Sequence, residues 1–587
     1  MFHLVKYLLV IIFSPFLFIN SQIIKNIEIN GNSAISKNEI ISWIKISQGQ
    51  KVFPGIIDSV KSRLALNYAN YGYFHSVFNG TNVISLPDSQ GVDLSISIKE
   101  NEPTYLRKIR FINANKSDST EIIPIFSYME GRVFEEASLV ENISSALTYY
   151  ENNGSPFSKI IISSLNFSDD TTEDKYYVDL TLIIDKGKKS TIDKIDIDGN
   201  TKTKDNVIIR EMRLSPGEEF SQKIIEEIPS RLNRLGFFEP VAVPDYYIDA
   251  QNEGVLVVRV KDKQTNNFDG IIGYVPGNNK VSGYLTGLVN ISLGNIFGTG
   301  RAAAIRWQKL DQSSQVLELK YLEPWILGLP VNINAGLLQR KQDSTYIQRD
   351  LNIGLEYLAN ENLSAAVTLS TESVIPSDAD TLSLTVYNSS SITTGLDLKY
   401  DTRDDPYSPT RGILFINSYS FSRKTINGPE KFINSNTKTK IDLQRIEVEF
   451  KTYYKLFQRQ IIALALNGKE LLGSFLEVSD LYRLGGANTL RGYAQDQFLG
   501  SRIFWSNLEY RFLLTQRSFG FLFMDTGYFF RPKDLVHNIP KTEGFRIGYG
   551  LGINLETNLG VISVSFALGQ GDTFSNGKIN FGIVNQF

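Results

Sequence analysis

The sequence contains no cysteine and only three histidines, and these two absences remove several classes of function. Without cysteine there can be no disulfide, thiol nucleophile, thiolate metal site or lipid anchor attached through an N-terminal cysteine. His3 lies at the extreme N-terminus, so any zinc site or histidine-based triad would depend on His75 and His537 alone. We therefore predict that the chain has no catalytic residues, binds no metal or cofactor, and is not an enzyme.

An excess of charge of one sign is also missing, and so are long apolar runs. The formal net charge of −3 gives no basic surface for nucleic acid. The apolar run Tyr7 to Ile19 has 13 residues, whereas a helix that crosses a bilayer needs about 20. With Lys6 before this run and Asn20-Ser21 after it, residues 1–21 are predicted to be a secretory signal peptide. A buried strand or core helix is the alternative interpretation.

The composition that is present favours β-structure. Aromatic residues make up 12% of the chain, and the 44 glycines occur among many Ser, Thr and Asn residues. No segment after the first has an uninterrupted apolar stretch of helical length. If this chain crosses a membrane, it must therefore do so as a β-barrel.

Three glycines mark an internal repeat. Gly72, Gly154 and Gly236 are spaced by 82 residues, and each follows an amphipathic helical pattern and precedes an aromatic residue. A glycine that ends a helix can adopt the left-handed conformation that redirects the chain into a strand. The equal spacing therefore favours three copies of one domain over three unrelated α/β domains.

The same order of elements recurs around each glycine. An alternating strand, a turn and two helical segments precede the glycine, and two strands follow it. The opening strands are predicted at Ile23–Ile29, Leu106–Ile112 and Ile192–Ile197. This β-α-α-β-β unit resembles the POTRA (polypeptide-transport-associated) domain, with copies predicted at residues 22–102, 103–187 and 188–263. In such a unit a strand at the sheet edge could pair with an extended peptide.

The pattern changes after Lys263, and residues 264–587 are predicted to form an all-β transmembrane barrel. Phe504, Leu508, Tyr510 and Phe512 alternate with Asn507, Glu509 and Arg511, so one face of this strand is apolar and the other is charged. A soluble sandwich would place its charge outside, whereas a barrel in a membrane keeps its polar side chains in the lumen. At roughly 20 residues per strand and connection, the region suits about 16 antiparallel strands.

The end of the chain also resembles an outer-membrane barrel. The sequence stops on Phe587 in an alternating segment that contains Asn580 and Gly582, as in the terminal insertion signal of such barrels. Asn585 departs from that pattern, because a hydrophobic residue is usual at its position.

Two motifs make the resemblance specific. The segment LGGANTLRGY (Leu484 to Tyr493) and the segment FMDTG (Phe523 to Gly527) are similar to signatures of the outer-membrane assembly factor superfamily, which includes BamA-type and TamA-type proteins. The resemblance implies that the sixth extracellular loop folds into the barrel and places Arg491, Gly492 and Tyr493 against the inner wall. The wall partners that it implies are Asp525, Phe523 and Gly527, with Glu509 on the neighbouring strand.

Two further segments agree with this resemblance, which covers essentially all of the chain after the signal peptide. Residues 401–412 (DTRDDPYSPTRG) look like the family's strand-turn-strand segment, and residues 295–301 (NIFGTGR) resemble its early hairpin. Gly298 and Gly300 could suggest a nucleotide-binding loop, but neither a helical pattern nor Gly-Lys-Ser/Thr follows them.

The resemblance implies a function in the bacterial outer membrane. Unfolded outer-membrane or secreted polypeptides would bind the periplasmic POTRA domains and enter the outer-membrane lipid through a seam between the first and last strands. We place these strands near Phe268–Val275 and Ile579–Phe587, with Gly270, Gly273, Gly582 and Phe587 at the seam. Periplasmic or inner-membrane-anchored accessory proteins are possible partners, and nucleic acid is not.

Three alternatives have different sequence expectations. A dedicated secretion pore of the two-partner type usually carries two repeats and a plug helix, whereas this chain has three repeats and no obvious plug. A passive porin would leave the repeats without a purpose, and a barrel-anchored enzyme would need a catalytic constellation. The number of repeats is closer to the TamA type than to the BamA type, but the subtype stays open.

Overall fold

A computed structural model describes most of the chain as two compact units. The described residues are 22–87, 91–170, 175–276, 283–309, 311–342, 345–376, 386–406, 408–433, 435, 437–515, 517–533, 539–557 and 560–584. The first unit lies within Met1–Ile192 and Gly217–Lys223, and the second within Asp193–Pro216 and Ile224–Phe587. The predicted signal peptide, His537, Asn585 and Phe587 lie outside the described residues.

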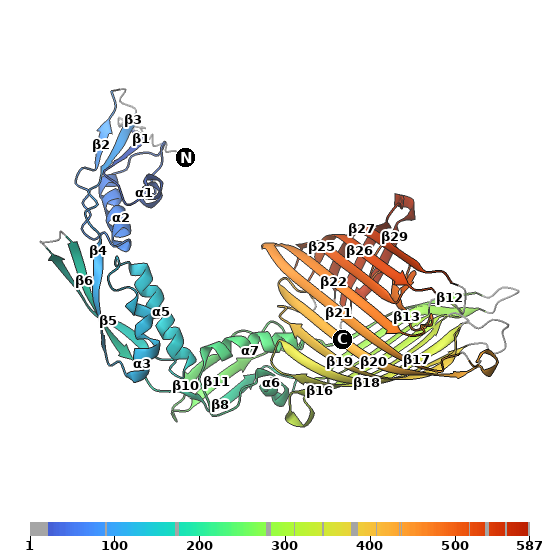
Figure 1. The fold of residues 1–587 in the computed structure, drawn as a ribbon. Helices are drawn as coiled ribbons and strands as arrows, with labels where there is room; N and C mark the ends of the chain where they lie inside the picture. Colours follow the sequence, from blue (N-terminus) through green and yellow to red (C-terminus); the bar gives the residue numbers. More distant parts are fainter. Residues whose placement is uncertain are drawn as a thin grey trace, which may run out of the picture. The chain divides into compact units, whose positions relative to one another are not determined.

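The first unit contains the first two repeats, and each is a three-stranded sheet with helices (Figure 1). The closing strand is central, parallel to the opening strand and antiparallel to the middle one, in the orders β1-β3-β2 and β4-β6-β5. The elements are β1 (Ile23–Asn30), α1 (Lys37–Ile44), α2 (Ile56–Asn70), β2 (Asn82–Ser85), β3 (Gly91–Ser97), β4 (Thr104–Ile112), α3 (Lys116–Glu121), α4 (Ile123–Ser127), α5 (Glu136–Asn152), β5 (Lys159–Asp170), β6 (Lys175–Asp185), β7 (Thr191–Ile192) and β9 (Glu218–Glu219).

Local sequence explains why these elements form. In α2 the residues Ile56, Val60, Leu64 and Tyr68 recur every four positions, and all four are buried against the sheet. The predicted left-handed glycines are confirmed, with φ values of 85° at Gly72, 78° at Gly154 and 70° at Gly236. Each of these glycines therefore turns the chain from the second helical segment toward the next strand.

The second repeat departs from the predicted pair of helical segments. Its first segment is split into two short helices, α3 and α4. Asn115 and Asp118 form a capping box at the start of α3, and Pro124 occupies the first turn of α4. Proline has no N–H to donate to the preceding turn, so the helix restarts at this point instead of continuing.

A buried carboxylate closes the first repeat. Glu100 is 5% exposed and accepts hydrogen bonds from the backbone N–H groups of Ser33 and Ala34, each at 2.7 Å, and from the Tyr68 hydroxyl at 2.8 Å. Burial raises the pKa of Glu100, but these hydrogen bonds favour the charged form and bring the pKa below its usual value. The charged carboxylate therefore stabilises the turn after β1.

We expect Glu100→Gln to loosen this turn. The folded-state pKa is depressed, so the contribution of Glu100 is fully present above the unfolded pKa of about 4.3 and is lost as the pH falls through the folded value. At neutral pH the loss of charge-assisted bonds should cost roughly 2 kcal/mol and speed amide exchange at residues 33–35 about 30-fold. Hydrogen–deuterium exchange of the full chain in detergent measures this effect, with the exposed Glu102→Gln as control. Equal exchange rates in the two variants would contradict the prediction.

The second unit contains the third repeat and the barrel. The third repeat consists of β8 (Lys194–Asp198), α6 (Asp205–Met212), α7 (Gln222–Arg234), β10 (Asp245–Ile248) and β11 (Gly254–Arg259), in the sheet order β10-β11-β8. Its opening strand was predicted as one segment, Ile192–Ile197, but it divides into β7 and β8. The interruption is at Asp193, whose N–H donates to the Gly254 carbonyl and whose side chain accepts from the Gly254 N–H. None of the helices in the described ranges is long and apolar enough to cross a membrane.

The predicted barrel of about 16 antiparallel strands is confirmed as a 16-stranded sheet in which sequence neighbours pair, except that β22 pairs with β25 across a long loop. Its strands are β12 (Asn266–Val275), β13 (Tyr284–Ile296), β14 (Arg301–Lys309), β15 (Gln315–Glu323), β16 (Val331–Gln342), β17 (Tyr346–Leu358), β18 (Leu363–Pro376), β19 (Asn388–Asp401), β20 (Gly412–Gly428), β21 (Lys440–Phe457), β22 (Gln460–Gly473), β25 (Arg502–Leu513), β26 (Phe519–Arg531), β27 (Thr542–Thr557), β28 (Gly560–Gly569) and β29 (Lys578–Val584). Figure 1 shows the sheet curled into a barrel.

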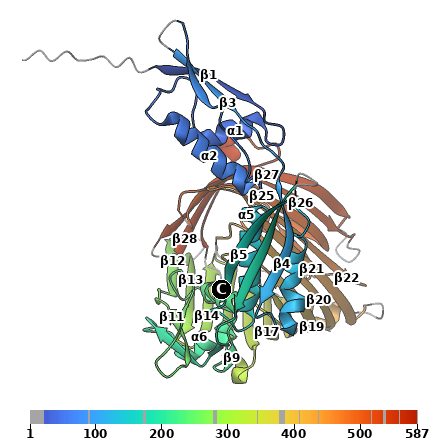
Figure 2. The ribbon, with the colours of Figure 1, turned by 90° about the vertical axis from the view of Figure 1, so that its left-hand side faces the viewer.

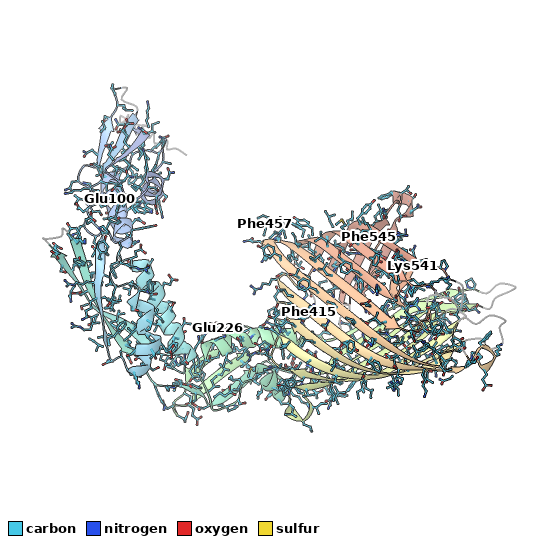
Figure 3. The ribbon with its side chains drawn as sticks, in the orientation of Figure 1. Glu100, Glu226, Phe415, Phe457, Lys541 and Phe545 are labelled. Atoms are coloured by element: carbon cyan, nitrogen blue, oxygen red, sulfur yellow. The ribbon has the colours of Figure 1, made fainter. Side chains whose placement is uncertain are left out.

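The outer face of the barrel is apolar. On β17, Leu351, Ile353 and Leu355 are about half exposed, although each is a large hydrophobic residue. Figure 3 shows Phe457 and Phe545 projecting from the outside of the sheet in the same way. Exposed apolar side chains in a continuous band suit a hydrocarbon surrounding and not water.

The segment predicted as an early hairpin also holds the third repeat against the barrel. Residues 297–300 form the turn between β13 and β14, and the Gly298 carbonyl accepts a hydrogen bond of 2.9 Å from the Lys204 N–H. The Asn295 side chain donates to the Thr203 hydroxyl at 2.7 Å, and Arg210 donates to the Thr299 carbonyl at 3.0 Å. A Cβ at Gly298 would lie 2.0 Å from the Lys202 carbonyl oxygen, so only glycine allows this close approach.

Candidate functional site: a loop held inside the barrel

The long connection between β22 and β25 folds into the barrel and does not simply span the gap. β22 and β25 are direct neighbours in the sheet, so residues 474–501 are not needed merely to connect them. Within this loop β23 (Tyr482–Leu484) and β24 (Phe498–Gly500) pair with each other.

Arg491 at the loop tip contacts Asp525 on β26 through three hydrogen bonds. The guanidinium Nε and Nη2 donate to the two carboxylate oxygens at 2.7 Å each, and the backbone N–H of Arg491 adds a third bond at 3.0 Å. Asp525 has no exposed surface and Arg491 is 8% exposed. Two parallel N–H···O bonds between a guanidinium and a carboxylate fix both distance and orientation.

The third nitrogen of the guanidinium also has a hydrogen-bond partner. Its Nη1 donates to Glu509 on β25 at 2.8 Å, and Arg511 pairs with the other oxygen of Glu509. The guanidinium carbon lies 3.7 Å from the ring centroid of Phe523, so Arg491 stacks on this ring while it binds both carboxylates. The structure thus brings together Arg491, Asp525, Glu509 and Phe523, all of which the sequence had singled out.

Gly492 and Tyr493 place the tip against the next strands. Gly492 has φ 92°, and a Cβ there would lie 2.5 Å from the Leu568 carbonyl oxygen. The Tyr493 hydroxyl donates to the Ile547 carbonyl at 3.0 Å and accepts from the Gln570 N–H at 3.1 Å. Gly527 leaves room for buried Leu490, because a Cβ on Gly527 would lie 2.9 Å from that side chain.

A glycine stripe on β27 was not singled out from the sequence. A Cβ on Gly548 would lie 1.8 Å from the Arg491 carbonyl oxygen, and Cβ atoms on Gly550 and Gly552 would collide with the rings of Phe523 and Phe521. The bare backbone therefore accommodates the aromatic rings over which Arg491 lies. The alternating glycines at 548, 550 and 552 were the signal that could have revealed this stripe.

Gly548→Ala is expected to displace the loop tip without removing any charge. Overpacking of this kind typically costs about 1–3 kcal/mol. Gly468→Ala on β22 is the matched control, since the nearest heavy atom to its Cβ is 3.9 Å away. Heat-induced unfolding followed by gel mobility should show a lower midpoint for Gly548→Ala only. A similar midpoint for both variants would show that the tip does not need this space.

A second anchor holds the start of the same loop and was not predicted. Lys424 on β20 is 1% exposed, and its ammonium lies 2.6 Å from Glu477 and 2.8 Å from Asp480. Glu477 also accepts a hydrogen bond of 2.7 Å from the Tyr387 N–H. Further along, Arg483 donates to the Tyr346 hydroxyl on β17 at 2.9 Å. The loop is therefore fixed to the wall at both its beginning and its tip.

The predicted seam residues lie apart from the loop. Gly270 and Gly273 are on β12 and Gly582 is on β29, at the two ends of the strand order. Gly270 packs closely on β13, whereas a Cβ on Gly582 would meet nothing within 4 Å. The described residues also contain no group of three or more His, Asp or Glu side chains placed to hold a metal ion.

Comparisons with known protein families match both the barrel and the repeats. The Omp85 superfamily domain matches residues 295–587, and the surface antigen variable number repeat, called POTRA, matches residues 22–101 and 190–263. Residues 103–187 lie between the matched POTRA ranges, and their sheet order is that of the other repeats.

Related proteins are longer than this chain. The outer membrane protein assembly factor BamA of Nitratidesulfovibrio vulgaris is 23% identical over 540 residues, which cover 84% of this chain and 64% of the relative. BamA of Neorickettsia risticii is 30% identical over 258 residues, which cover 43% of this chain and 33% of the relative. A crystal structure of BamA from Haemophilus ducreyi lacking POTRA domains 1–3 is 17% identical, covering 82% of this chain and 98% of that one, with a TM-score of 0.46. The chain thus spans less than two thirds of the length of these two curated relatives.

Proposed function

Because the chain belongs to the Omp85 superfamily, we propose that it assists the insertion of unfolded polypeptides into the outer membrane. The barrel lies in that membrane and the POTRA repeats lie in the periplasm. We count residues 103–187 as a further POTRA domain, because their sheet has the same strand order. The superfamily is not enzymatic, so the free energy for insertion must come from binding of the client and from exchange of backbone hydrogen bonds. The clients that we propose are outer-membrane polypeptides.

This proposal rests on the two terminal barrel strands, because each is paired on one side only in the part of the chain that the structure describes. Among the described residues, β12 has one neighbour, β13, and β29 has one neighbour, β28. Both strands also expose large apolar side chains, such as Phe268 at 64% and Phe581 at 70%. A strand paired on one side only offers N–H and C=O groups to a client strand, and the lipid-facing side chains keep that site in the membrane.

The second POTRA domain supports delivery of a client. Its edge strand β5 has 12 residues, compared with 4 in each of the edge strands β2 and β10. Ile161, Ile162 and Leu165 on β5 are 48%, 45% and 38% exposed. An extended polypeptide could add to this edge through backbone bonds, which do not depend on its sequence. We propose β5 as the principal periplasmic contact for clients.

The position of the loop argues against a passive porin. The contacts of Arg491 with Asp525 and Glu509 hold the loop tip within the lumen. Single-channel recordings should therefore show small, flickering conductance in place of the large steady conductance of a diffusion pore.

A reversible crosslink tests the seam. Because the chain has no cysteine, a cysteine pair placed across β12 and β29 would be its only thiols. In liposomes, the oxidised variant should insert an unfolded outer-membrane protein no faster than liposomes alone, and a reductant should restore the wild-type rate. The control disulfide joins Leu398 and Asn417, which already face each other across β19 and β20.

Two outcomes would change the proposal. Wild-type insertion by the oxidised seam variant would reject the lateral opening. Release of the client on the far side of the membrane, without insertion, would indicate a dedicated secretion pore.

Deletion of residues 22–187 in the same assay measures delivery of the client by the first two repeats. We expect insertion to be lost because β5 is then absent. Accessory proteins that co-purify by crosslinking would define the subtype.

A further inference from the structure

One periplasmic turn of the barrel has an unusual composition. Residues 324–330, between β15 and β16, read Pro-Trp-Ile-Leu-Gly-Leu-Pro and contain no charged or hydrogen-bonding side chain except the tryptophan indole. Two other turns at the same end, residues 359–362 (Ala-Asn-Glu-Asn) and 515–518 (Thr-Gln-Arg-Ser), are polar. A turn in water is normally built from polar residues, proline and glycine, so this one requires another explanation.

The apolar side chains of this turn are presented outward. Leu327 is 93% exposed and Leu329 is 57% exposed. Leu327 and Trp325 adopt φ values of 54° and 53°, in the left-handed region that L side chains rarely occupy. A strained backbone that exposes leucine is unfavourable in water, and neither feature is needed to join two adjacent strands.

The turn is nevertheless well defined. It contains the short helix η1 (Ile326–Gly328), and the Leu329 N–H donates to the Ile326 carbonyl at 2.9 Å. The backbone N–H of Trp325 donates to the side-chain oxygen of Asn332 on β16 at 3.2 Å. The Arg213 guanidinium carbon lies 6.0 Å from the centroid of the Trp325 ring. These contacts hold the base of the turn in place, while Leu327 and Leu329 stay uncovered.

The direction of the turn indicates what surrounds it. Figure 1 shows it beside β16, projecting sideways from the barrel wall and not along the strands, and Figure 2 shows the yellow-green turn projecting beyond the rim of the barrel. On β15, Leu319 and Tyr321 are 37% and 39% exposed on the outer face that leads to the turn. The turn is therefore continuous with the surface that the barrel presents to lipid.

A neighbouring turn shows the same combination of features. Phe297, in the turn between β13 and β14, is 85% exposed and has φ 54°. Because β14 and β15 are adjacent, the two turns lie at the same end of the barrel and only two strands apart. Two strained, exposed, apolar residues near each other are difficult to attribute to chance.

We propose that the turn 324–330 inserts into the periplasmic leaflet of the outer membrane, where phospholipid acyl chains cover Leu327 and Leu329. Tryptophan is favoured at the membrane–water interface, and the indole of Trp325 lies at the base of the turn. Through Arg213 on one side and the Arg210–Thr299 contact on the other, the anchored turns hold the third POTRA domain close to the leaflet. The proposal depends on the outer-membrane location alone and not on the insertion activity.

A single cysteine provides the probe, because the natural chain has none. The full-length Leu327→Cys variant is labelled with an environment-sensitive fluorophore and reconstituted in phosphatidylcholine vesicles, with or without acyl-chain bromination. Ala359→Cys, in the polar turn, is the matched control. We expect quenching by brominated lipid that is at least about twofold greater at residue 327 than at residue 359. Equal quenching, together with equal access of aqueous iodide to both labels, would overturn the proposal.

A second variant separates insertion from folding. In a labelled Leu329→Cys background, Leu327→Asp should abolish quenching by brominated lipid while the heat-dependent gel mobility of the barrel is retained, because residue 327 makes little contact with the rest of the fold. Unchanged quenching would count against insertion of the turn. Shielding of the label only after addition of envelope proteins, with no quenching by brominated lipid, would identify a protein contact and overturn the proposal.

Discussion

Replacing Arg491 by alanine is expected to lower the stability of the folded barrel by about 3–5 kcal/mol, because the change leaves two carboxylates without their shared partner. Asp525 has no exposed surface and loses both hydrogen bonds from the guanidinium. Glu509 keeps only Arg511. Alanine retains the backbone N–H but none of the charge, so the loop tip should leave the wall.

Unfolding midpoints in detergent, measured by heat-dependent gel mobility and by denaturant titration, give the change for Arg491→Ala. Arg502→Ala is the control, since Arg502 on β25 pairs with Glu470 on β22 at 2.6 Å but is 57% exposed. An exposed pair is worth about 0–1 kcal/mol. Arg491→Lys should restore the charge but not the two-pronged contact, and so recover only part of the loss. If Arg491→Ala and Arg502→Ala unfold alike, the tip contact is not what secures the loop.

Lys424→Met should be at least as destabilising, by about 3–5 kcal/mol, since it exposes two buried carboxylates to each other without a cation. Glu477 and Asp480 have side-chain exposures of 0% and 1%, so water cannot replace the ammonium without opening the cluster. Methionine keeps most of the side-chain volume, and the effect therefore reports charge and not a cavity. Loss of the contact should release the first part of the loop, which limited proteolysis at residues 474–480 would detect.

Lys469→Met is the control for this second variant. Lys469 pairs with Glu447 at 2.6 Å, but both side chains are about one third exposed. Comparison of Arg491→Ala, Lys424→Met and the double variant tests whether the two anchors act on one loop. If they do, the double variant should lose less stability than the sum of the single losses. Simple additivity would mean that the beginning and the tip of the loop are held independently.

The repeats and the barrel could be recognised because their signals are local. Left-handed glycines after a helical pattern, and side chains that alternate along a strand, act within a few residues of the chain. The departures also have local causes, namely Pro124 in the second repeat and the bonds of Asp193 with Gly254 in the third. A prediction from pattern alone places the elements well and their interruptions poorly.

The tip of the loop was predictable from its resemblance to a family signature, whereas its base was not. Lys424 is one lysine in an alternating strand, and Glu477 and Asp480 are ordinary loop residues. The contact of Lys424 with these two carboxylates depends on how residues 474–501 fold back to β20. No short segment of the sequence determines that path. The stripe at Gly548, Gly550 and Gly552 lies between these cases, since its pattern is visible in the sequence but its purpose depends on the neighbouring rings.

The strand count has a consequence for what the proposed seam can accept. In an antiparallel sheet with 16 strands, the first and the last run in opposite directions. A single added strand would be antiparallel to one of them and parallel to the other, whereas a pair joined by a tight turn would be antiparallel to both. Clients should therefore enter in multiples of two strands, and a segment with an odd number of strands should stall with one side incorrectly aligned.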